Sequence, residues 1–349
     1  MAAADGTTTT TRGTGPGRRR ALRTLAASAA ATAAAMPLWA RAQGNTTRWQ
    51  FATPYPDGNF HTRNLRQFVE EAQSASGGRL AVQVHSNASL LRMPEIRRGV
   101  QTGQAQMGEI LLSAYANEDP FFALDGIPQL VTSYEGAKRL MDLSRPFIEA
   151  RMQRTGLTLL YMVPWPPSGL YTQAPLEDAE GLRGTKMRTF SPLTNRFATL
   201  VGATPTLVQV PEIPQAFATG VVNAMVTSAA TGVDSQAWDF VRVFTPIGFT
   251  WTKNAVFANA RALSALPAEV QAGIKAAAAA AEARGWAMSQ QEEAEKKAAL
   301  AQRGMQVREP TPALMAALKR VSDTMVDEWL ATAGEDGKRV VDAYRAANA

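Results

Sequence analysis

The chain has no cysteine and only two histidines, His61 and His85, among its 349 residues. Without thiols it has no disulfide, no thiolate zinc site and no cysteine nucleophile. Two histidines are too few for a histidine-rich metal site, and a Ser-His-Asp triad would have to use one of them. The chain also lacks the G-x-S-x-G, P-loop, G-x-G-x-x-G and H-E-x-x-H patterns. We therefore expect no metal, no other cofactor and no enzymatic activity, with an enzyme as the less favoured alternative.

An excess of positive charge is also missing from most of the chain. The formal net charge is +6, but residues 1–42 hold six of the 36 basic residues and only one of the 30 acidic residues. The remainder therefore carries 30 basic and 29 acidic residues. A nearly neutral body gives no electrostatic reason to bind a phosphate backbone, so we expect no nucleic-acid partner.

Long runs of strongly apolar residues are absent too. The uncharged stretch at residues 24–40 is mostly alanine and shorter than the roughly 20 apolar residues of a spanning helix. It follows an arginine cluster at residues 18–23 and ends at Ala40-Arg41-Ala42, a small-x-small cleavage site. This order is typical of an export signal, and the consecutive arginines favour the twin-arginine route over the Sec route. We predict a signal peptide at 1–42, cleavage near Ala42 and a periplasmic product; a membrane anchor is the alternative.

The rest of the chain has enough apolar residues for two domains of ordinary size. Alternating apolar residues predict strands at 49–52, 80–84 and 106–112, with helices between them. This β-α-β-α-β order favours a parallel sheet with crossover helices. A helix at 134–154 and a strand at 157–163 follow. The proline-rich residues 164–169 interrupt regular structure and mark the best boundary between two lobes.

A second α/β block follows that boundary. We predict strands at 184–188, 205–208, 224–227 and 256–259, and helices at 194–201 and 213–219. A long helix begins at Pro267 and continues to about Gln302, which at 1.5 Å per residue is roughly 54 Å. Such a helix is longer than one lobe, so we expect it to lie across both. Two helices near 312–331 and 336–347 complete the chain.

These patterns predict an α/β fold of two lobes, each a mixed sheet flanked by helices, with the long helix spanning both. Lobe I would comprise residues 43–168 and about 249–265. Lobe II would comprise residues 169–248 and about 266–349, including the long helix and the C-terminal helices.

Several motifs, in order and at specific spacing, resemble the extracytoplasmic solute-binding subunit of tripartite ATP-independent periplasmic (TRAP) transporters, the DctP-type family. Residues 68–84 resemble its first helix, Gly-Gly turn and next strand. Residues 95–108 match its glutamate and G-x-x-x-M passage, and residues 182–188 match its Leu-x-Gly-x-Lys-x-Arg motif. Further matches are Gly202-Ala-Thr-Pro205, Glu212, Gly220-Val-Val and the start of the long helix at Leu266-Pro267. Together they cover nearly all of residues 48–345.

The resemblance implies a two-lobed periplasmic binding protein that captures an organic acid and delivers it to TRAP integral-membrane subunits. A monomer is expected. A binding protein that serves a sensor would take the same ligands and stays open as an alternative. An ABC-type binding protein is a further alternative, against which the long helix after Pro267 argues.

The resemblance also places the ligand carboxylate on Arg188, the last residue of a predicted strand. A guanidinium suits this role because it offers a planar pair of donors to a carboxylate. The chain departs from the family after Gly220-Val-Val, where Thr227 and Ser228 replace an amide by hydroxyls. A second family arginine is missing from residues 168–171. These departures favour a monocarboxylate over a C4-dicarboxylate.

Aromatic residues near predicted strand ends and linkers suggest an apolar or aromatic remainder on the ligand. Of Trp165, Tyr171, Phe190, Trp238 and Trp251, we expect two to touch ligand and the others to lie in the core. Glu109 would accept a ligand hydroxyl or amine, or pair with an arginine. His61, near Asn59, would lie at a cleft rim or face solvent. The predicted ligand-binding set is Arg188, Thr227, Ser228, Trp251, Glu109, Tyr171, Phe190 and His61.

Overall fold

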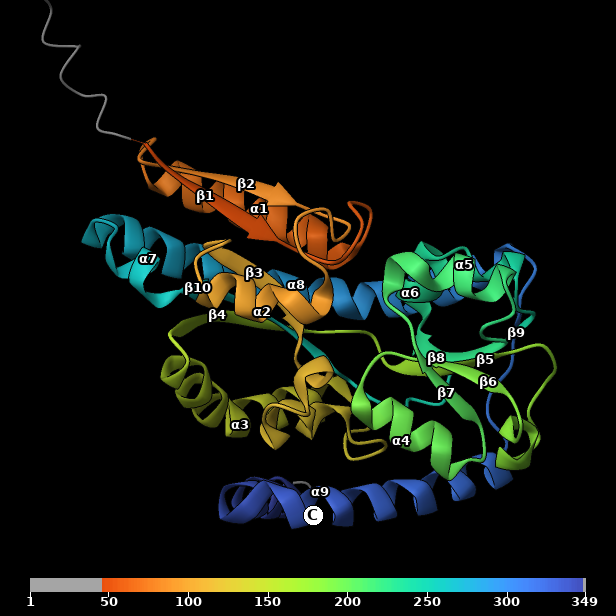
Figure 1. The fold of residues 1–349 in the computed structure, drawn as a ribbon. Helices are drawn as coiled ribbons and strands as arrows, with labels where there is room; N and C mark the ends of the chain where they lie inside the picture. Colours follow the sequence, from red (N-terminus) through yellow and green to blue (C-terminus); the bar gives the residue numbers. More distant parts are fainter. Residues whose placement is uncertain (1–45, 348–349) are drawn as a thin grey trace, which may run out of the picture. The chain divides into compact units, whose positions relative to one another are not determined.

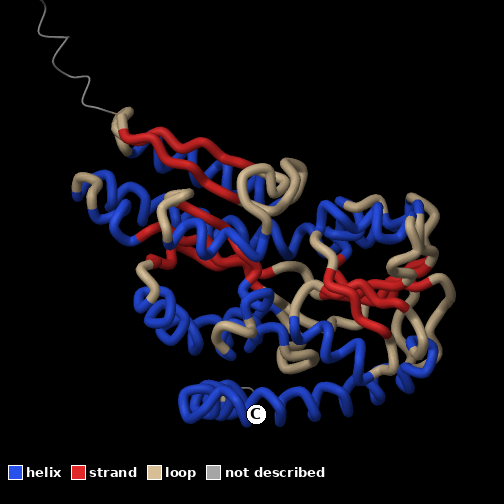
Figure 2. Tube along the Cα trace, in the orientation of Figure 1, coloured by secondary structure: helices blue, strands red, loops and turns tan. Residues whose placement is uncertain are grey.

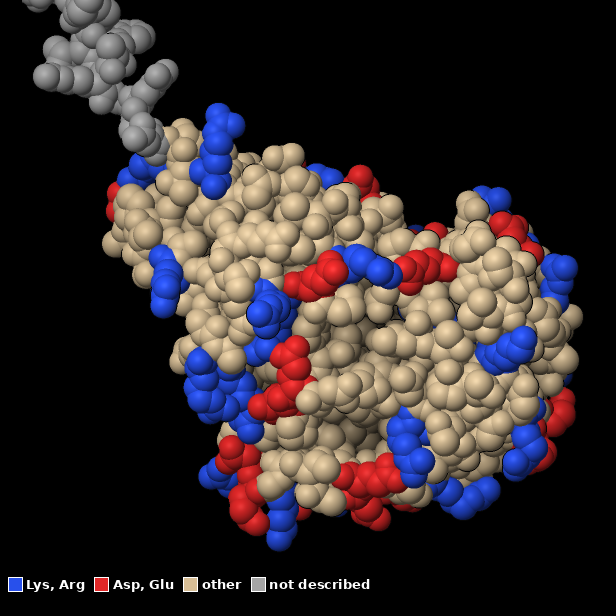
Figure 3. Space-filling model, viewed as in Figure 1, with Lys and Arg blue, Asp and Glu red and all other residues tan. Residues whose placement is uncertain are grey.

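The computed structural model describes residues 46–347 (Figure 1). The predicted signal peptide and its cleavage site lie outside these residues. None of the helices within 46–347 has the combination of length and apolarity that crossing a bilayer requires. On the face seen in Figure 3, acidic and basic side chains are interspersed, as the near balance of charge in this part of the chain leads one to expect.

The first sheet has five strands in the order β2-β1-β3-β10-β4. Their bounds are β1 (Thr47–Ala52), β2 (Leu80–His85), β3 (Met107–Leu111), β4 (Leu157–Pro164) and β10 (Lys253–Asn259). The strand β1 pairs in parallel with β2 and β3, whereas β10 is antiparallel to both β3 and β4. The predicted β-α-β-α-β opening is confirmed, with α1 (Phe60–Ala75) and α2 (Met93–Gln101) as its crossover helices.

The second sheet has six strands in the order β11-β9-β5-β8-β6-β7. They are β5 (Ser168–Thr172), β6 (Lys186–Thr189), β7 (Thr204–Leu207), β8 (Ala224–Ser228), β9 (Val243–Thr245) and β11 (Gln306–Val307). The strand β6 is parallel to β7 and β8, and β8 is antiparallel to β5. The prediction that residues 164–169 interrupt regular structure is wrong at both ends, since β4 reaches Pro164 and β5 begins at Ser168.

Helices cover both sheets (Figure 2). The shorter ones are α3 (Tyr134–Arg154), α4 (Pro192–Leu200), α5 (Ile213–Ala218), α6 (Ala229–Asp234) and α7 (Ala260–Ser264). Single 3-10 turns connect other elements: η2 (Leu112–Tyr115), η3 (Pro120–Gly126), η4 (Ala179–Leu182), η5 (Val210–Glu212) and η6 (Ala237–Asp239). One apolar core surrounds the first sheet, and two smaller cores lie on the two faces of the second.

Two long helices connect the lobes. The helix α8 (Ala268–Gln302) packs against α1 and β4 of the first lobe and against α6 and β11 of the second, which confirms that it spans both. The helix α9 (Pro312–Ala346) contains one non-helical residue, Gly334, with φ 66° and ψ −166°. Glycine tolerates this backbone conformation. The break falls between the two C-terminal helices that the sequence predicts.

Two of the segments in which the chain crosses between the sheets are hydrogen-bonded to each other. One is the segment from β4 to β5, and the other is the segment from β9 to β10. The amide of Trp165 donates to the Thr252 carbonyl at 2.8 Å, and the amide of Ser168 donates to the Thr250 carbonyl at 3.1 Å. The paired crossing segments hold the two sheets together beside the cavity described next.

Candidate functional site

A cavity lies where the crossing segments meet the strand ends of both sheets. Its volume is about 430 Å³, including space that is open to solvent. This size suits a small molecule rather than a long chain. The lining residues are Tyr55, Met93, Leu111, Trp165 and Thr252 from the first sheet and its loops, and Ser168, Arg188, Phe190, Gln209, Val210, Thr227, Ser228 and Thr231 from the second.

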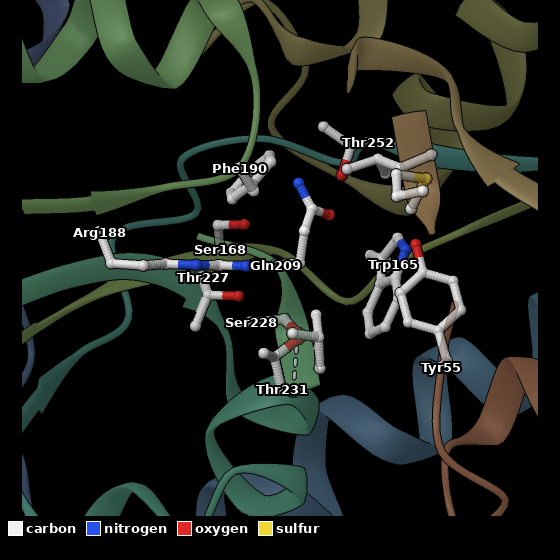
Figure 4. A pocket seen from close by; sticks show the side chains of 13 residues that line it. Tyr55, Trp165, Ser168, Arg188, Phe190, Gln209, Thr227, Ser228, Thr231 and Thr252 are labelled. Carbon is white, nitrogen blue, oxygen red and sulfur yellow. Dashed lines mark hydrogen bonds between the residues drawn. The ribbon is translucent and has the colours of Figure 1, made fainter. Parts of the chain in front are cut away.

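Arg188 reaches the cavity from the end of β6 (Figure 4). Since β6 lies between the parallel strands β7 and β8, the carboxyl ends of all three strands meet at one edge of the sheet. Ligand groups of α/β folds gather at such an edge. The sequence-based placement of Arg188 at a strand end beside a loop is thereby confirmed.

Within residues 46–347, the buried guanidinium of Arg188 has no carboxylate partner. Its side chain is 2% exposed, its Nε donates to the Val208 carbonyl at 2.9 Å, and its Nη1 has no hydrogen-bond partner among residues 46–347. Burial lowers its pKa to about 10, so that it still carries its charge at neutral pH. An unpaired buried charge is unfavourable, and an anion in the cavity would relieve that cost.

Hydroxyl and amide groups surround the end of Arg188. Thr227 and Ser228 end β8, and Ser168 lies directly opposite Ser228 in the β5–β8 pair. Gln209 extends its carboxamide into the same region from the loop after β7 (Figure 4). The ring of Phe190 lies 5.6 Å from the Arg188 guanidinium carbon, a cation–π distance. Together these groups form a polar end that can bind a carboxylate by charge and by hydrogen bonds.

The opposite end of the cavity is aromatic. The rings of Tyr55 and Trp165 pack edge to face with centroids 5.1 Å apart (Figure 4). The Tyr55 hydroxyl donates to Asn254 Oδ1 at 3.1 Å, and Trp165 Nε1 donates to the same oxygen at 2.8 Å. Because both donors are used on Asn254, the two rings offer mainly carbon surface to the cavity. We refer to Tyr55 and Trp165 below as the aromatic wall.

Contacts between the lobes lie beside the cavity. Arg92, directly before α2, pairs with Glu212 of η5. The Glu212 carboxylate also accepts a hydrogen bond from the backbone N–H of Gln209 at 3.2 Å, and so it anchors a segment that lines the cavity. Elsewhere, Asn59 Nδ2 donates to Asp234 Oδ2 at 2.6 Å, joining the start of α1 to the end of α6. These contacts hold the lobes together around the cavity.

The structure brings four of the eight predicted site residues together: Arg188, Phe190, Thr227 and Ser228 all line the cavity. Of the five aromatic residues considered from sequence, Phe190 and Trp165 line it. That these residues contact a ligand stays a prediction.

The other four predicted residues do not line the cavity. Tyr171 lies on the face of β5 opposite to that of the lining residue Ser168. Its ring centroid is 4.6 Å from that of Phe244, and its hydroxyl donates a hydrogen bond to the Ser228 carbonyl. Trp251 precedes the lining residue Thr252, and successive residues of an extended chain point to opposite sides. Its ring packs near Tyr134 instead.

Glu109 and His61 lie behind the aromatic wall. Glu109 is buried in β3, two residues before the lining residue Leu111, which shares its face of the strand. His61, in the first turn of α1, is buried rather than solvent-facing, with its ring 4.5 Å from that of Trp165. No arginine pairs with Glu109 among the described residues. Its nearest titratable neighbour is His61, with Nδ1 3.6 Å from Oε1; burial lowers the pKa of His61 well below its usual value, so the two do not form an ion pair at neutral pH.

Sequence reasoning did not find several lining residues. Gln209 follows the predicted strand 205–208 by one residue, so the strand-end argument that found Arg188 could also have found it. Tyr55 lies in a Pro- and Gly-rich loop, and Met93 and Thr231 lie at helix starts. No spacing rule points to these positions.

The two lobes, their paired crossing segments and the cavity beside them define a two-lobed ligand-binding protein. The chain belongs to the DctP family, the bacterial extracellular solute-binding proteins of family 7, whose family model matches residues 51–332. The resemblance seen in the sequence motifs is therefore confirmed. The solved structures that resemble this chain agree with it.

One similar structure is a Bordetella pertussis extracytoplasmic solute receptor that binds pyroglutamic acid, with 43% identity, a TM-score of 0.85 and coverage of 86% of this chain and 99% of that one. A second is a marine metagenome TRAP solute-binding protein specific for pyroglutamate, with 32% identity, a TM-score of 0.84 and coverage of 86% and 99%. A solute-binding protein of Albidiferax ferrireducens is 25% identical over 240 residues, 65% of this chain and 68% of that protein.

Proposed function

We propose that this protein is a periplasmic receptor that captures a small monocarboxylic acid and delivers it to TRAP membrane subunits. The observation that carries the proposal is Arg188, a buried guanidinium whose Nη1 has no partner within the described chain. Carboxylates bind guanidinium groups through charge-assisted, often paired, hydrogen bonds. A ligand carboxylate at the polar end of the cavity would compensate the buried charge.

The lining residues favour a small, compact ligand that carries one carboxylate group. Arg188 is the only cation among the residues that line the cavity, which supports a monocarboxylate over a dicarboxylate. The aromatic wall at the other end supports an apolar face on the ligand. The limited free space supports a small ring or a short chain.

Pyroglutamate is the leading candidate. It carries one carboxylate on a five-membered ring, and two similar proteins of 43% and 32% identity bind it. Its carboxylate would lie on Arg188 and its ring against the aromatic wall. Its lactam has one N–H donor and one carbonyl acceptor, and Gln209 offers a carboxamide with matching groups.

The family and the sequence support a location and a partner for this receptor. Cleavage after Ala42 would release residues 43–349 into the periplasm. There, a ligand-bound form would dock on TRAP integral-membrane subunits. A carrier must bind its solute without changing it chemically. A cavity lined by one charged group, hydroxyls and aromatic rings suits that task.

A thermal-shift screen of the mature protein tests this function. The set should contain L-pyroglutamate, other monocarboxylates, C4-dicarboxylates, sugar acids and neutral sugars. A ligand that binds only the folded state raises stability in proportion to the logarithm of its concentration. We expect the largest shifts from L-pyroglutamate and similar small monocarboxylates. Largest shifts from neutral sugars or cations would refute the proposal.

A further inference from the structure

A buried carboxamide lies behind the aromatic wall and connects its two rings. Asn254 of β10 does not line the cavity, yet its Oδ1 accepts hydrogen bonds from both Tyr55 Oη and Trp165 Nε1. The two rings come from different segments, one after β1 and one after β4. A single oxygen atom therefore joins two side chains that lie far apart in the sequence.

The direction in which the carboxamide faces is set by Glu109. Asn254 Nδ2 donates to Glu109 Oε1 at 3.0 Å, and Thr53 Oγ1 donates to Glu109 Oε2 at 2.6 Å. An ionised carboxylate only accepts hydrogen bonds, so it selects the orientation in which the Asn254 amino group faces it. The opposite orientation would place that amino group against the Trp165 indole N–H, which can only donate, and would require the Tyr55 hydroxyl to accept instead of donate.

This selection does not depend on the charge of Glu109. If Glu109 carries a proton on Oε2, the proton can be donated to the Thr53 hydroxyl, which is able to accept it. Oε1 then still accepts from Asn254. A glutamine in place of Glu109 would act in the same way, with its oxygen toward Asn254 and its amino group toward Thr53. An apolar side chain at position 109 would offer no acceptor to the Asn254 amino group and so would not select its orientation.

We infer that Glu109 and Asn254 are positioning residues for ligand binding: they hold Tyr55 and Trp165 as one wall and direct the polar groups of both rings away from the cavity. The inference rests on the proposed function in so far as the wall receives the apolar face of the solute. It gives Glu109, which the sequence suggested as a ligand contact, a role through Asn254 instead.

The chain provides matched variants for a test. Glu109→Met removes the acceptor for Asn254, whereas Glu109→Gln keeps it. Asn254→Leu keeps the branched shape of the side chain but leaves the Tyr55 hydroxyl and the Trp165 indole N–H without their acceptor. Tyr161→Phe is the control, because it removes a buried hydroxyl of the same sheet that has no hydrogen-bond partner among residues 46–347.

The first readout needs no ligand. The indole N–H resonance of Trp165, assigned in a ¹H–¹⁵N spectrum with Trp165→Phe, should move upfield in Asn254→Leu and in Glu109→Met. It should stay in place in Glu109→Gln and Tyr161→Phe. The second readout is calorimetric affinity for L-pyroglutamate. We expect a loss of about tenfold or more in Asn254→Leu, about threefold or more in Glu109→Met, and less than twofold in the other two variants.

Each outcome decides the question. An unmoved Trp165 resonance in both Asn254→Leu and Glu109→Met overturns the inference, as does wild-type affinity in both. If Asn254→Leu does not fold, the comparison of Glu109→Met with Glu109→Gln decides alone. If the wild-type protein does not bind L-pyroglutamate, the proposed ligand is wrong, while the Trp165 resonance still tests whether Glu109 and Asn254 hold the wall.

Discussion

Replacing Arg188 by methionine should abolish tight ligand binding without destabilising the ligand-free protein. Truncating one partner of a buried, hydrogen-bonded charge pair costs about 2–5 kcal/mol of binding free energy. At about 1.4 kcal/mol per decade, the dissociation constant should rise by roughly 30-fold to several thousand-fold. Arg188→Lys should recover only part of this loss, because a point charge cannot reproduce the planar guanidinium.

The ligand-free protein should respond in the opposite direction. Burial lowers the Arg188 pKa from 12.5 to about 10, which corresponds to a cost of about 3 kcal/mol for the charged form. Methionine removes that cost and loses the hydrogen bond to Val208, worth about 1 kcal/mol, and the cation–π contact with Phe190, worth about 1 kcal/mol. The free energy of unfolding of ligand-free Arg188→Met should therefore equal or exceed that of the wild type.

Chemical denaturation and calorimetry on the same samples measure both effects. Arg196→Met is the matched control, because Arg196 is a half-exposed arginine that pairs with Glu328 on α9 and does not line the cavity. It should bind ligand normally. Normal ligand binding by Arg188→Met would refute the assignment of Arg188 as the carboxylate partner. A clear loss of stability without ligand would refute the argument that its charge is uncompensated.

Ligand binding should shift the lobes further toward the closed arrangement of this structure by bending at the crossing segments, so small-angle scattering should give a smaller radius of gyration with ligand; an unchanged radius during confirmed binding would contradict closure. Mass spectrometry of the periplasmic fraction should find a chain that begins at Gln43, and a membrane-bound form that retains Met1 would contradict the predicted export. Burial raises the pKa of Glu109 from 4.5 to about 7, so the folded protein keeps a proton that the unfolded chain releases. The free energy of unfolding should therefore fall by about 3 kcal/mol as pH rises from about 4.5 to about 7. Urea unfolding at several pH values should show a smaller fall in Glu109→Gln than in the wild type. An equal fall in the wild type and the variant would assign the pH dependence to other groups.

Periodic patterns predicted most of the fold because they reflect local preferences. The helix Tyr134–Arg154 and the long helix from Pro267 have the predicted extents to within one residue. The strand β5 was missed because Ser168 and Gly169 directly follow three prolines and a tryptophan and have low strand propensity. In the structure, Gly169 allows close approach to Phe244 and to the Thr245 carbonyl, either of which a Cβ would contact at under 3 Å. This requirement comes from tertiary packing and leaves no local pattern.

The site could be predicted only in part, for a geometric reason. Arg188 and Thr227 lie at strand ends, and strand ends can be read from a pattern. Whether a residue near a strand end faces the cavity depends on one position along the strand, as Trp251 beside Thr252 shows. Tyr55 enters from a loop whose path no periodicity describes. The departures from the family motif, in contrast, indicated hydroxyls at positions 227 and 228 that do line the cavity.

The central claim is that the cavity captures a small acid through its carboxylate. Calorimetric titration of the mature wild-type protein with L-pyroglutamate and with L-pyroglutamamide tests it most directly, because the two compounds differ only in the group that would meet Arg188. We expect saturable binding of L-pyroglutamate and a dissociation constant at least about 30-fold higher for the neutral amide. Equal affinity for the two compounds, or no binding of either, would contradict the account.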